Sequence, residues 1–292
     1  MRRLTLVLPV LSVLTVLPVR PSSAQQKIEK RIAVAADASI RIYNLAGTTR
    51  ITGWERDSIA VTGFAPPGTS FFMGGAGRTA KLGLEPDEKS KQTTGGSLEV
   101  RVPRGARVWI KSADGSIEVA GMTGEVDLST IAGGIKVTGT LRLVTAESME
   151  GDVEVSGASP LVRVKTGGGK ILLRQAGGDV IASTVSGPIV ATEAQLASAR
   201  LETLSGPVSY SGTLDRRGTL NIQTHSGDIE LLLPATIGAE FDLASTSGLA
   251  LVALPAKSGK PLKSRSIFFT NAGGGAQIVA RSFKGRISVF GQ

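Results

Sequence analysis

The sequence predicts an all-β, single-domain parallel β-helix or β-solenoid, in which the chain winds through stacked coils of about 18–21 residues. A motif of a glycine followed by alternating aliphatic residues recurs at this spacing, and a second alternating segment lies between successive glycines. The chain has no cysteine. Its stability must therefore come from burial and backbone hydrogen bonds rather than from disulfides.

The glycines of the motif mark one corner of each coil. They stand 18, 18, 18, 18, 19 and 21 residues apart in the run Gly115, Gly133, Gly151, Gly169, Gly187, Gly206 and Gly227, and Gly248 and Gly285 follow after 21 and 37 residues. Such regular spacing is typical of a stacked repeat. We expect these nine glycines to turn the chain with positive φ, a conformation that glycine adopts without steric penalty.

Each predicted coil contains two short strands. Inward aliphatic and outward polar residues alternate in Gly115–Val119 and again in Glu125–Thr130, and later coils repeat the pattern. A left-handed hexapeptide helix also has 18-residue coils, but it needs an aliphatic residue every six positions. Counting from Ile117, Thr123 and Ser129 occupy those positions, so we expect right-handed crossovers instead.

Parallel stacking of these coils makes two rows predictable. Residues that are 18 positions apart should lie directly above one another. The inward row then contains Ile117, Ile135 and Val153, and an outward row of alternating charge contains Glu118, Lys136 and Glu154.

The ends of the repeat are less regular. Segments 39–43, 47–54 and 57–64 alternate with looser spacing and are predicted to form the first coil and a cap. Residues 65–97 are rich in glycine, proline and polar residues, so we expect a long, partly mobile loop excursion there. Residues 255–275 are predicted to be an insertion in the last coil.

The first residues resemble an export signal. A basic start at Met1–Arg3 precedes an apolar run at Leu4–Val19, and small residues follow at Ser22–Ala24. Pro9 and Pro18 interrupt the run, which argues against a membrane anchor. We expect a signal peptide over 1–24, cleaved after Ala24, and a β-solenoid domain over 25–292 without a later transmembrane segment.

Charge and composition limit the classes of partner that the sequence predicts. The net charge falls from +9 to +6 when Arg2, Arg3 and Arg20 leave with the signal peptide, which suits anionic envelope polymers or lipid headgroups. The basic residues are scattered, and the chain has only two Trp and two Tyr. Nucleic-acid binding is therefore not predicted.

No reactive constellation stands out. His225 is the only histidine, so neither a histidine metal site nor a relay is available, and we interpret it as structural. The glycine-rich segment 74–77 lacks the Lys-Ser/Thr pair of a phosphate loop. Turn chemistry explains Asp114, Asp152 and Asp228 beside the corner glycines. We predict no catalytic residue, no cofactor and no metal.

Several stretches of the sequence resemble the DUF4097 family of secreted bacterial proteins, which are labelled putative adhesins. The resemblance covers about 28–290 and is most specific in ITGWERD and in VPRGARV, which leads into the first corner glycine. It implies a β-helix-like solenoid outside the cytoplasm with a role in adhesion or the envelope. The family offers no agreed catalytic residues.

Three functions remain open from the sequence. The leading hypothesis is a non-catalytic repeat scaffold in the periplasm or on the cell surface, an adhesin or envelope-associated protein that binds a glycan or a protein partner. A polysaccharide lyase or hydrolase is the first alternative, with Asp152 and Glu154 beside Lys136 and Lys170 as its nearest candidate cluster. A sensory or regulatory partner in envelope stress is the second. A monomer is slightly favoured.

Overall fold

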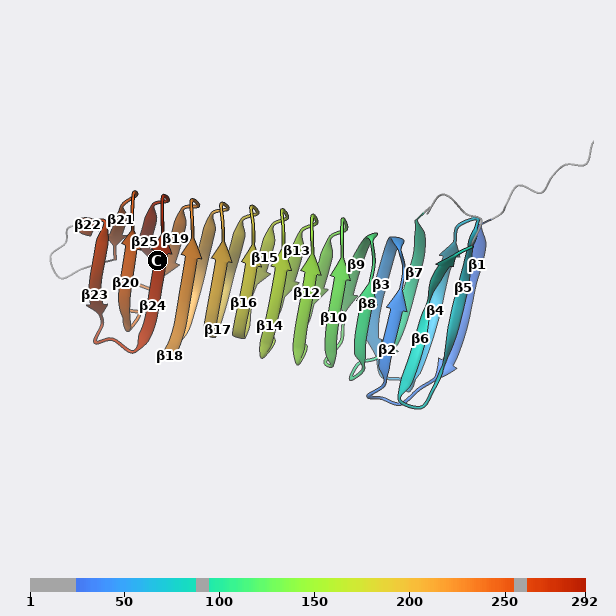
Figure 1. Cartoon of the computed structure of the whole chain (residues 1–292). Coiled ribbons are helices and arrows are strands. Elements are labelled where there is room, and N and C mark those ends of the chain that lie inside the picture. Colours follow the sequence, from blue (N-terminus) through green and yellow to red (C-terminus); the bar gives the residue numbers. More distant parts are fainter. Residues whose placement is uncertain (1–24, 88–94, 255–261) are drawn as a thin grey trace, which may run out of the picture.

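The computed structural model describes residues 25–87, 95–254 and 262–292. In these ranges the chain forms 25 strands and no helix, so an all-β fold is confirmed, and a membrane-spanning helix is absent from them. The predicted signal peptide and its cleavage point at Ala24 lie outside the described residues. Figure 1 shows an elongated molecule in which the strands stand side by side in two stacks, one in front of the other.

The front stack of Figure 1 is parallel except at its two outermost pairs, β5–β6 and β20–β23. From right to left it contains β5 (Thr69–Ala76), β6 (Thr79–Pro86), β2 (Ser39–Tyr43), β8 (Arg107–Lys111), β10 (Glu125–Thr130), β12 (Leu143–Ser148), β14 (Leu161–Thr166), β16 (Gly177–Thr184), the second halves of β17 (Ile189–Thr203) and β18 (Val208–Thr224), β24 (Ala276–Ser282), β20 (Ala239–Ser245) and β23 (Ser266–Asn271).

The rear stack is built in the same way, with antiparallel pairs at its ends. It contains β1 (Gln26–Ala33), β4 (Ser58–Ala65), β7 (Gly96–Pro103), β3 (Ala46–Trp54), β9 (Asp114–Ala120), β11 (Ile135–Thr138), β13 (Val153–Ser156), β15 (Ile171–Arg174), the first halves of β17 and β18, β19 (Ile229–Leu233), β25 (Ile287–Gly291), β21 (Ala250–Ala253) and β22 (Leu262–Ser264). Because β17 and β18 run through both stacks, all strands belong to one mostly parallel sheet.

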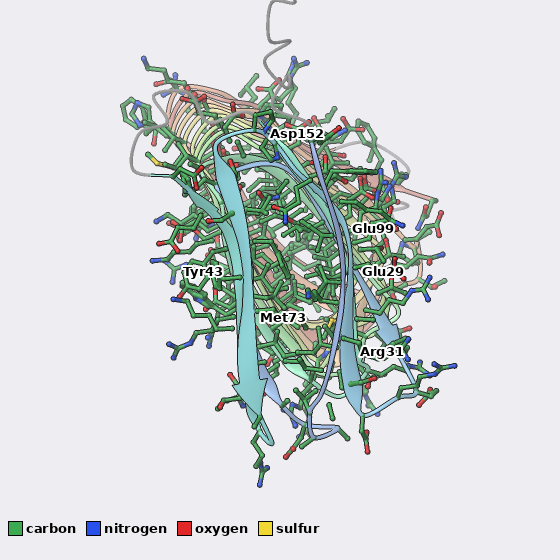
Figure 2. The ribbon with its side chains drawn as sticks, turned by 90° about the vertical axis from the view of Figure 1, so that its right-hand side faces the viewer. Glu29, Arg31, Tyr43, Met73, Glu99 and Asp152 are labelled. Carbon is green, nitrogen blue, oxygen red and sulfur yellow. The ribbon has the colours of Figure 1, made fainter. Side chains whose placement is uncertain are left out.

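The core lies between the two stacks and consists of rows of aliphatic side chains that run from strand to strand along the long axis of the molecule. Ile135 pairs with Ile117 on one side and with Val153 on the other, so the predicted inward row is confirmed. All three side chains are buried. An end-on view shows side chains filling the space between the stacks (Figure 2). Each strand gains hydrogen bonds and apolar contact only from its neighbours, so the stack is the stable unit.

The outer faces carry charged rows in the same register. Lys136 lies between Glu118 and Glu154, as predicted, with its Nζ 3.7 Å from a Glu154 carboxylate oxygen. Arg50 extends the row, because its guanidinium contacts both Glu99 and Glu118. Exposed pairs of this kind contribute at most about 1 kcal/mol each. The row therefore determines the charge pattern of the outer face but contributes little to the stability of the fold.

The corner glycines lie in one continuous row, but the expectation of positive φ is wrong for all nine. They are needed because neighbouring coils approach too closely for a side chain. A Cβ added to Gly133, Gly151 or Gly169 would lie far less than 3.0 Å from the carbonyl oxygen of the corner glycine in the preceding coil. Real Cβ atoms essentially never come so close.

A buried hydroxyl stands three residues before most of these glycines and links the coils. Thr166 is representative: its Oγ1 accepts a hydrogen bond from the Gly169 N–H at 3.1 Å and donates one to the Gly151 carbonyl, also at 3.1 Å. Ser148 makes the same two bonds with Gly151 and Gly133. We call this feature the hydroxyl ladder, which comprises Thr130, Ser148, Thr166, Thr184, Thr203, Thr224, Ser282 and Ser245.

The C-terminal coils do not stack in sequence order. Gly285 lies over Gly227, and Gly248 lies outside Gly285, so the last coil is inserted between its two predecessors. The chain end therefore lies inside the row (Figure 1). The predicted insertion at 255–275 lies between β21 and β24, the two strands that the sequence analysis places in the last coil. Within it, 262–264 and 266–271 form β22 and β23, which pair antiparallel with β21 and β20, while 255–261 lie outside the described residues.

At the N-terminal end, too, the strands do not stack in sequence order. The coil formed by β2 and β3 lies between the β8–β9 coil and strands β6 and β7, which follow it in sequence. The prediction of a long loop over 65–97 is therefore wrong. Residues 69–86 form the β5–β6 hairpin, because Phe71, Met73, Leu82 and Leu84 alternate inward and extend the core. Residues 88–94 lie outside the described part of the chain.

The glycine row predicts a sharp contrast between two adjacent residues. Gly169→Ala should lower the free energy of unfolding by about 3 kcal/mol, because the new methyl group collides with the backbone of the preceding coil. Gly168→Ala is the matched control, since its Cβ would meet no atom closer than 3.8 Å, and it should change stability by less than about 0.5 kcal/mol. Urea unfolding measures both; equal effects would contradict the close-contact explanation.

The hydroxyl ladder predicts a second contrast. Thr166→Val keeps the shape of the side chain but leaves the Gly169 N–H and the Gly151 carbonyl without their hydroxyl partner, which should cost about 1–3 kcal/mol. Ser112 is the control, because it occupies the equivalent position before Gly115 and its buried Oγ has no partner among the described residues. Ser112→Ala should be nearly neutral in the same unfolding experiment.

Candidate functional site

The carboxylates that suggested an enzyme serve as structural groups. Asp152 accepts a hydrogen bond from the backbone N–H of Lys170 in the next coil at 2.7 Å. Glu154 lies between Lys136 at 3.7 Å and Arg174 at 3.5 Å. The pair is therefore occupied with backbone capping and ion pairing on a solvated surface.

The corner aspartate Asp228 has the same role. Its Oδ1 accepts the Arg286 backbone N–H at 2.7 Å, and Arg286 belongs to the coil that lies next to it in space. In the described ranges, no group of three His, Cys, Asp or Glu side chains could hold a metal ion. Asp152 and Asp228 thus hold adjacent coils together.

An apolar ridge runs along the edge where the front strands end. Except at Gly167, the residue after each ladder hydroxyl is exposed, and five of these side chains are large, apolar and 45–62% exposed. The ridge comprises Ile131, Met149, Val185, Leu204 and Phe283. His225 continues the ridge: it is exposed, and its ring stacks on Phe283 with centroids 4.9 Å apart.

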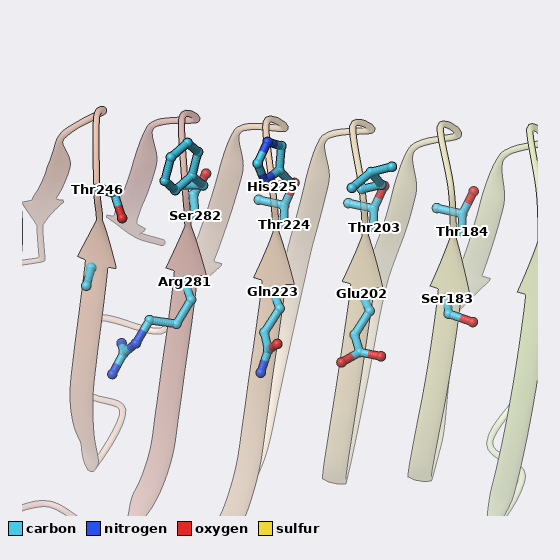
Figure 3. Close-up of a pocket in the computed structure, with 13 residues that line it drawn as sticks. Ser183, Thr184, Glu202, Thr203, Gln223, Thr224, His225, Thr246, Arg281 and Ser282 are labelled. Carbon is cyan, nitrogen blue, oxygen red and sulfur yellow. The ribbon is translucent and has the colours of Figure 1, made fainter.

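A shallow groove of about 610 Å³ lies beside the ridge. Figure 3 shows its outward row of Ser183, Glu202, Gln223 and Arg281 on four adjacent strands. Arg281 is already paired with Asp242. The groove is open and is lined by polar, charged and apolar side chains, which form no catalytic arrangement.

The most distinctive surface feature is an aromatic and basic cluster on the front face of the N-terminal end. We call it the platform, and it comprises Arg41, Tyr43, Phe72, Lys81, Trp109 and Lys111. The Tyr43 and Trp109 rings meet edge to face with centroids 5.4 Å apart, and the Tyr43 and Phe72 centroids are 6.4 Å apart. Figure 2 shows Tyr43 on the outer side of the front stack.

Strand register assembles the platform. Arg41 lies between Lys81 and Trp109, while Tyr43 lies between Gly83 and Lys111. Phe72 reaches the same face from β5, opposite Gly83. A Cβ added to Gly83 would lie 2.2 Å from the Tyr43 carbonyl oxygen, so the close approach of β6 and β2 at this point requires glycine.

The cations of the platform lie over its rings. The Lys81 ammonium is 5.0 Å from the Tyr43 centroid and 5.2 Å from that of Phe72, and the Lys111 ammonium is 5.1 Å from that of Trp109. Neither these lysines nor Arg41 form an ion pair with any residue that the structure describes. Their charge is thus held in place without a partner carboxylate at contact distance.

A hollow of about 430 Å³ opens beside these cations. Arg41 and Lys81 border it together with Gly74, where an added Cβ would meet no atom within 4 Å. On the opposite side of the platform, Asp127 pairs with Trp109 across the strands. Burial raises the pKa of the Asp127 carboxyl and Glu147 raises it further, while Lys111 opposes the shift.

None of the six platform residues was predicted from sequence. A signal was present, because Tyr43 and Trp109 each stand two residues from a basic side chain of the same strand face, in SIRIY and RVWIK. Their meeting depends on the β2–β8 pairing between segments more than 60 residues apart. The alternation of each strand alone gives no such information.

Comparison with solved structures finds only distant similarities. A "putative adhesin" of Bacteroides fragilis is 10% identical, with 91% of this chain and 98% of that chain covered and a TM-score of 0.44. A "putative lipid binding protein" of Parabacteroides distasonis is 13% identical, with 90% and 96% covered and a TM-score of 0.43. At such low values these structures say nothing about what this chain binds.

The family comparison is decisive. No curated protein matches the sequence at a significant level. The family model described as Toastrack DUF4097 matches residues 39–289, which is most of the chain. This range includes all nine corner glycines and every described strand except β1 and the end of β25, so the chain belongs to the Toastrack DUF4097 family.

Proposed function

We propose that the protein is a non-catalytic binding scaffold of the bacterial envelope, an adhesin-like protein that is exported and presents its outer faces to a partner. In this proposal the coils are right-handed and about 18–21 residues long. The partner is an envelope glycan or a protein of the cell surface. The family match supports the fold, while the adhesin role and its ligand belong to the proposal.

One observation carries the proposal: the reactive side chains of the repeat are engaged in holding coils together, while the outer faces remain regular and exposed. Asp152 and Asp228 cap backbone N–H groups, and Glu154 is ion-paired. Catalysis by carboxylates requires an acid and a base that face a shared substrate position. Binding requires only a stable surface, which the stacked coils supply.

Two exposed features support a binding role. The apolar ridge places five large aliphatic or aromatic side chains in water, and surfaces of this kind mark interaction sites. The platform places rings and unpaired cations on the front face. A charge of +6 after signal removal favours anionic partners.

Export is tested first. Expressed with its leader in a bacterial host, the protein should leave the cytoplasm and begin at Gln25, which mass spectrometry of the released protein measures. Ala24→Trp should prevent cleavage, because the processing site accepts small side chains. A mature cytoplasmic protein that still carries residues 1–24 would contradict the predicted location.

Binding and catalysis are tested with the purified full chain. It should be retained by bacterial envelope fractions, and it should release no sugar from envelope polysaccharides. Asp152→Asn should change neither result, because Asp152 caps a backbone amide. Sugar release that this substitution abolishes would establish an enzyme and overturn the proposal.

A further inference from the structure

We infer that the platform is a binding site for an acidic glycan, with a sugar ring on Tyr43 and Trp109 and its anionic substituent between Arg41 and Lys81. This inference rests on the proposed binding function and names the ligand class for it. Four features carry it: the rings, the cations, the adjoining hollow and the limits of the charged area.

The rings provide the sugar-binding surface. Tyr43, Trp109 and Phe72 are half-buried on an outer face, whereas most apolar side chains of the sheet point into the core. The face of an aromatic ring carries negative charge density. It therefore attracts the weakly positive C–H groups that line one side of a pyranose. The Tyr43 and Trp109 rings meet at 67°, with the Lys81 and Lys111 ammoniums 5.0 and 5.1 Å from their centroids. A sugar would therefore contact the ring surface that the lysine and the neighbouring ring leave free.

The cations provide the selection for charge. Lys81 and Lys111 are oriented by the rings beneath them, and Arg41 is paired by register with Lys81 and Trp109. An arginine offers a planar fork that matches a carboxylate, sulfate or phosphate. A ligand anion would supply the contact-distance countercharge that Arg41 and Lys81 lack among the described residues.

The hollow provides the space for the anionic group. Its volume of about 430 Å³ falls within the range of about 300–1,000 Å³ typical of small-molecule sites. At Gly74, an added Cβ would have no neighbour within 4 Å, so the space is not required for packing. Arg41 and Lys81 reach it from the side that adjoins the rings.

The extent of the charged area favours a short anionic segment over a nucleic acid. The three cations come from neighbouring strands β6, β2 and β8, and the next strand, β10, brings Asp127 beside Trp109. Proteins that bind single-stranded nucleic acid need a basic groove that follows several successive phosphates. Here acid follows the cations at once, which suits one or two charges on a sugar chain.

The experiment uses the full exported chain and polygalacturonate, a uronate polymer. Its methyl-esterified form serves as the uncharged comparison, and vesicles of phosphatidylglycerol and inorganic phosphate test other anions. Trp54 and Trp109 are the only tryptophans, so Trp54→Phe leaves Trp109 as the single fluorescent reporter within the platform. Titration should change its emission with polygalacturonate and not with the esterified polymer.

Side-chain variants locate the site. Arg41→Gln and Lys81→Gln should each weaken binding to polygalacturonate by about tenfold, the value of one charge-assisted contact. Arg163→Gln is the matched control, because Arg163 is exposed on the same face at β14 and, like Arg41, forms no ion pair among the described residues, and it should have no effect. Unchanged thermal unfolding of each variant shows that the fold is intact.

The remaining outcomes separate this inference from the proposed function. Retention on envelope fractions that is insensitive to Arg41→Gln and Lys81→Gln would overturn the platform site and leave a binding scaffold. Equal binding of the charged and esterified polymers would overturn the selection for an acidic sugar. Binding to vesicles or to inorganic phosphate without binding to the polymer would also overturn it. If the unmodified protein is not retained by envelope fractions, the binding scaffold is refuted, and the platform site that rests on it is refuted as well.

Discussion

The structure depends on the close approach of backbones along the row of corner glycines. Neighbouring strands must lie about 4.8 Å apart to share hydrogen bonds, and at this corner even a methyl group would collide with the carbonyl of the preceding coil. The hydroxyl ladder completes the contact by bonding the glycine N–H and carbonyl groups. Buried backbone groups thus remain paired where strand pairing ends.

This constraint separates the interior from the surface. Inward positions are aliphatic or, as at Tyr210 and Phe241, aromatic, and corner positions are glycine, because each is fixed by the coils on both sides. Outward positions meet only solvent and their neighbours in a row, as Lys136 does between Glu118 and Glu154. Outward side chains can therefore be replaced by residues that bind a ligand without changing the fold. This explains how Tyr43 and Trp109 can occupy positions where other coils have charged residues.

The sequence was sufficient for the rows but not for their order. Spacing and alternation predicted that Ile117, Ile135 and Val153 would be stacked, because each step joins consecutive coils. Because the coils have similar sequences, the sequence does not show which coil stacks on which, and the position of the Gly285 coil beside Gly227 could not be predicted. The reason for the corner glycines was also hidden, since tight contact and positive φ demand the same residue.

The N-terminal cap joins stability to function. An open end of a parallel stack exposes unpaired strand groups and invites association with other strands. Here the β5–β6 hairpin covers the front stack, and its inner residues, such as Phe71 and Met73, extend the core. Its outer residues are free of the repeat's spacing and bring Phe72, Lys81 and the Gly74 hollow beside Tyr43. Because a cap departs from the repeat on one face only, it is the place where a unique site can be added to a uniform surface.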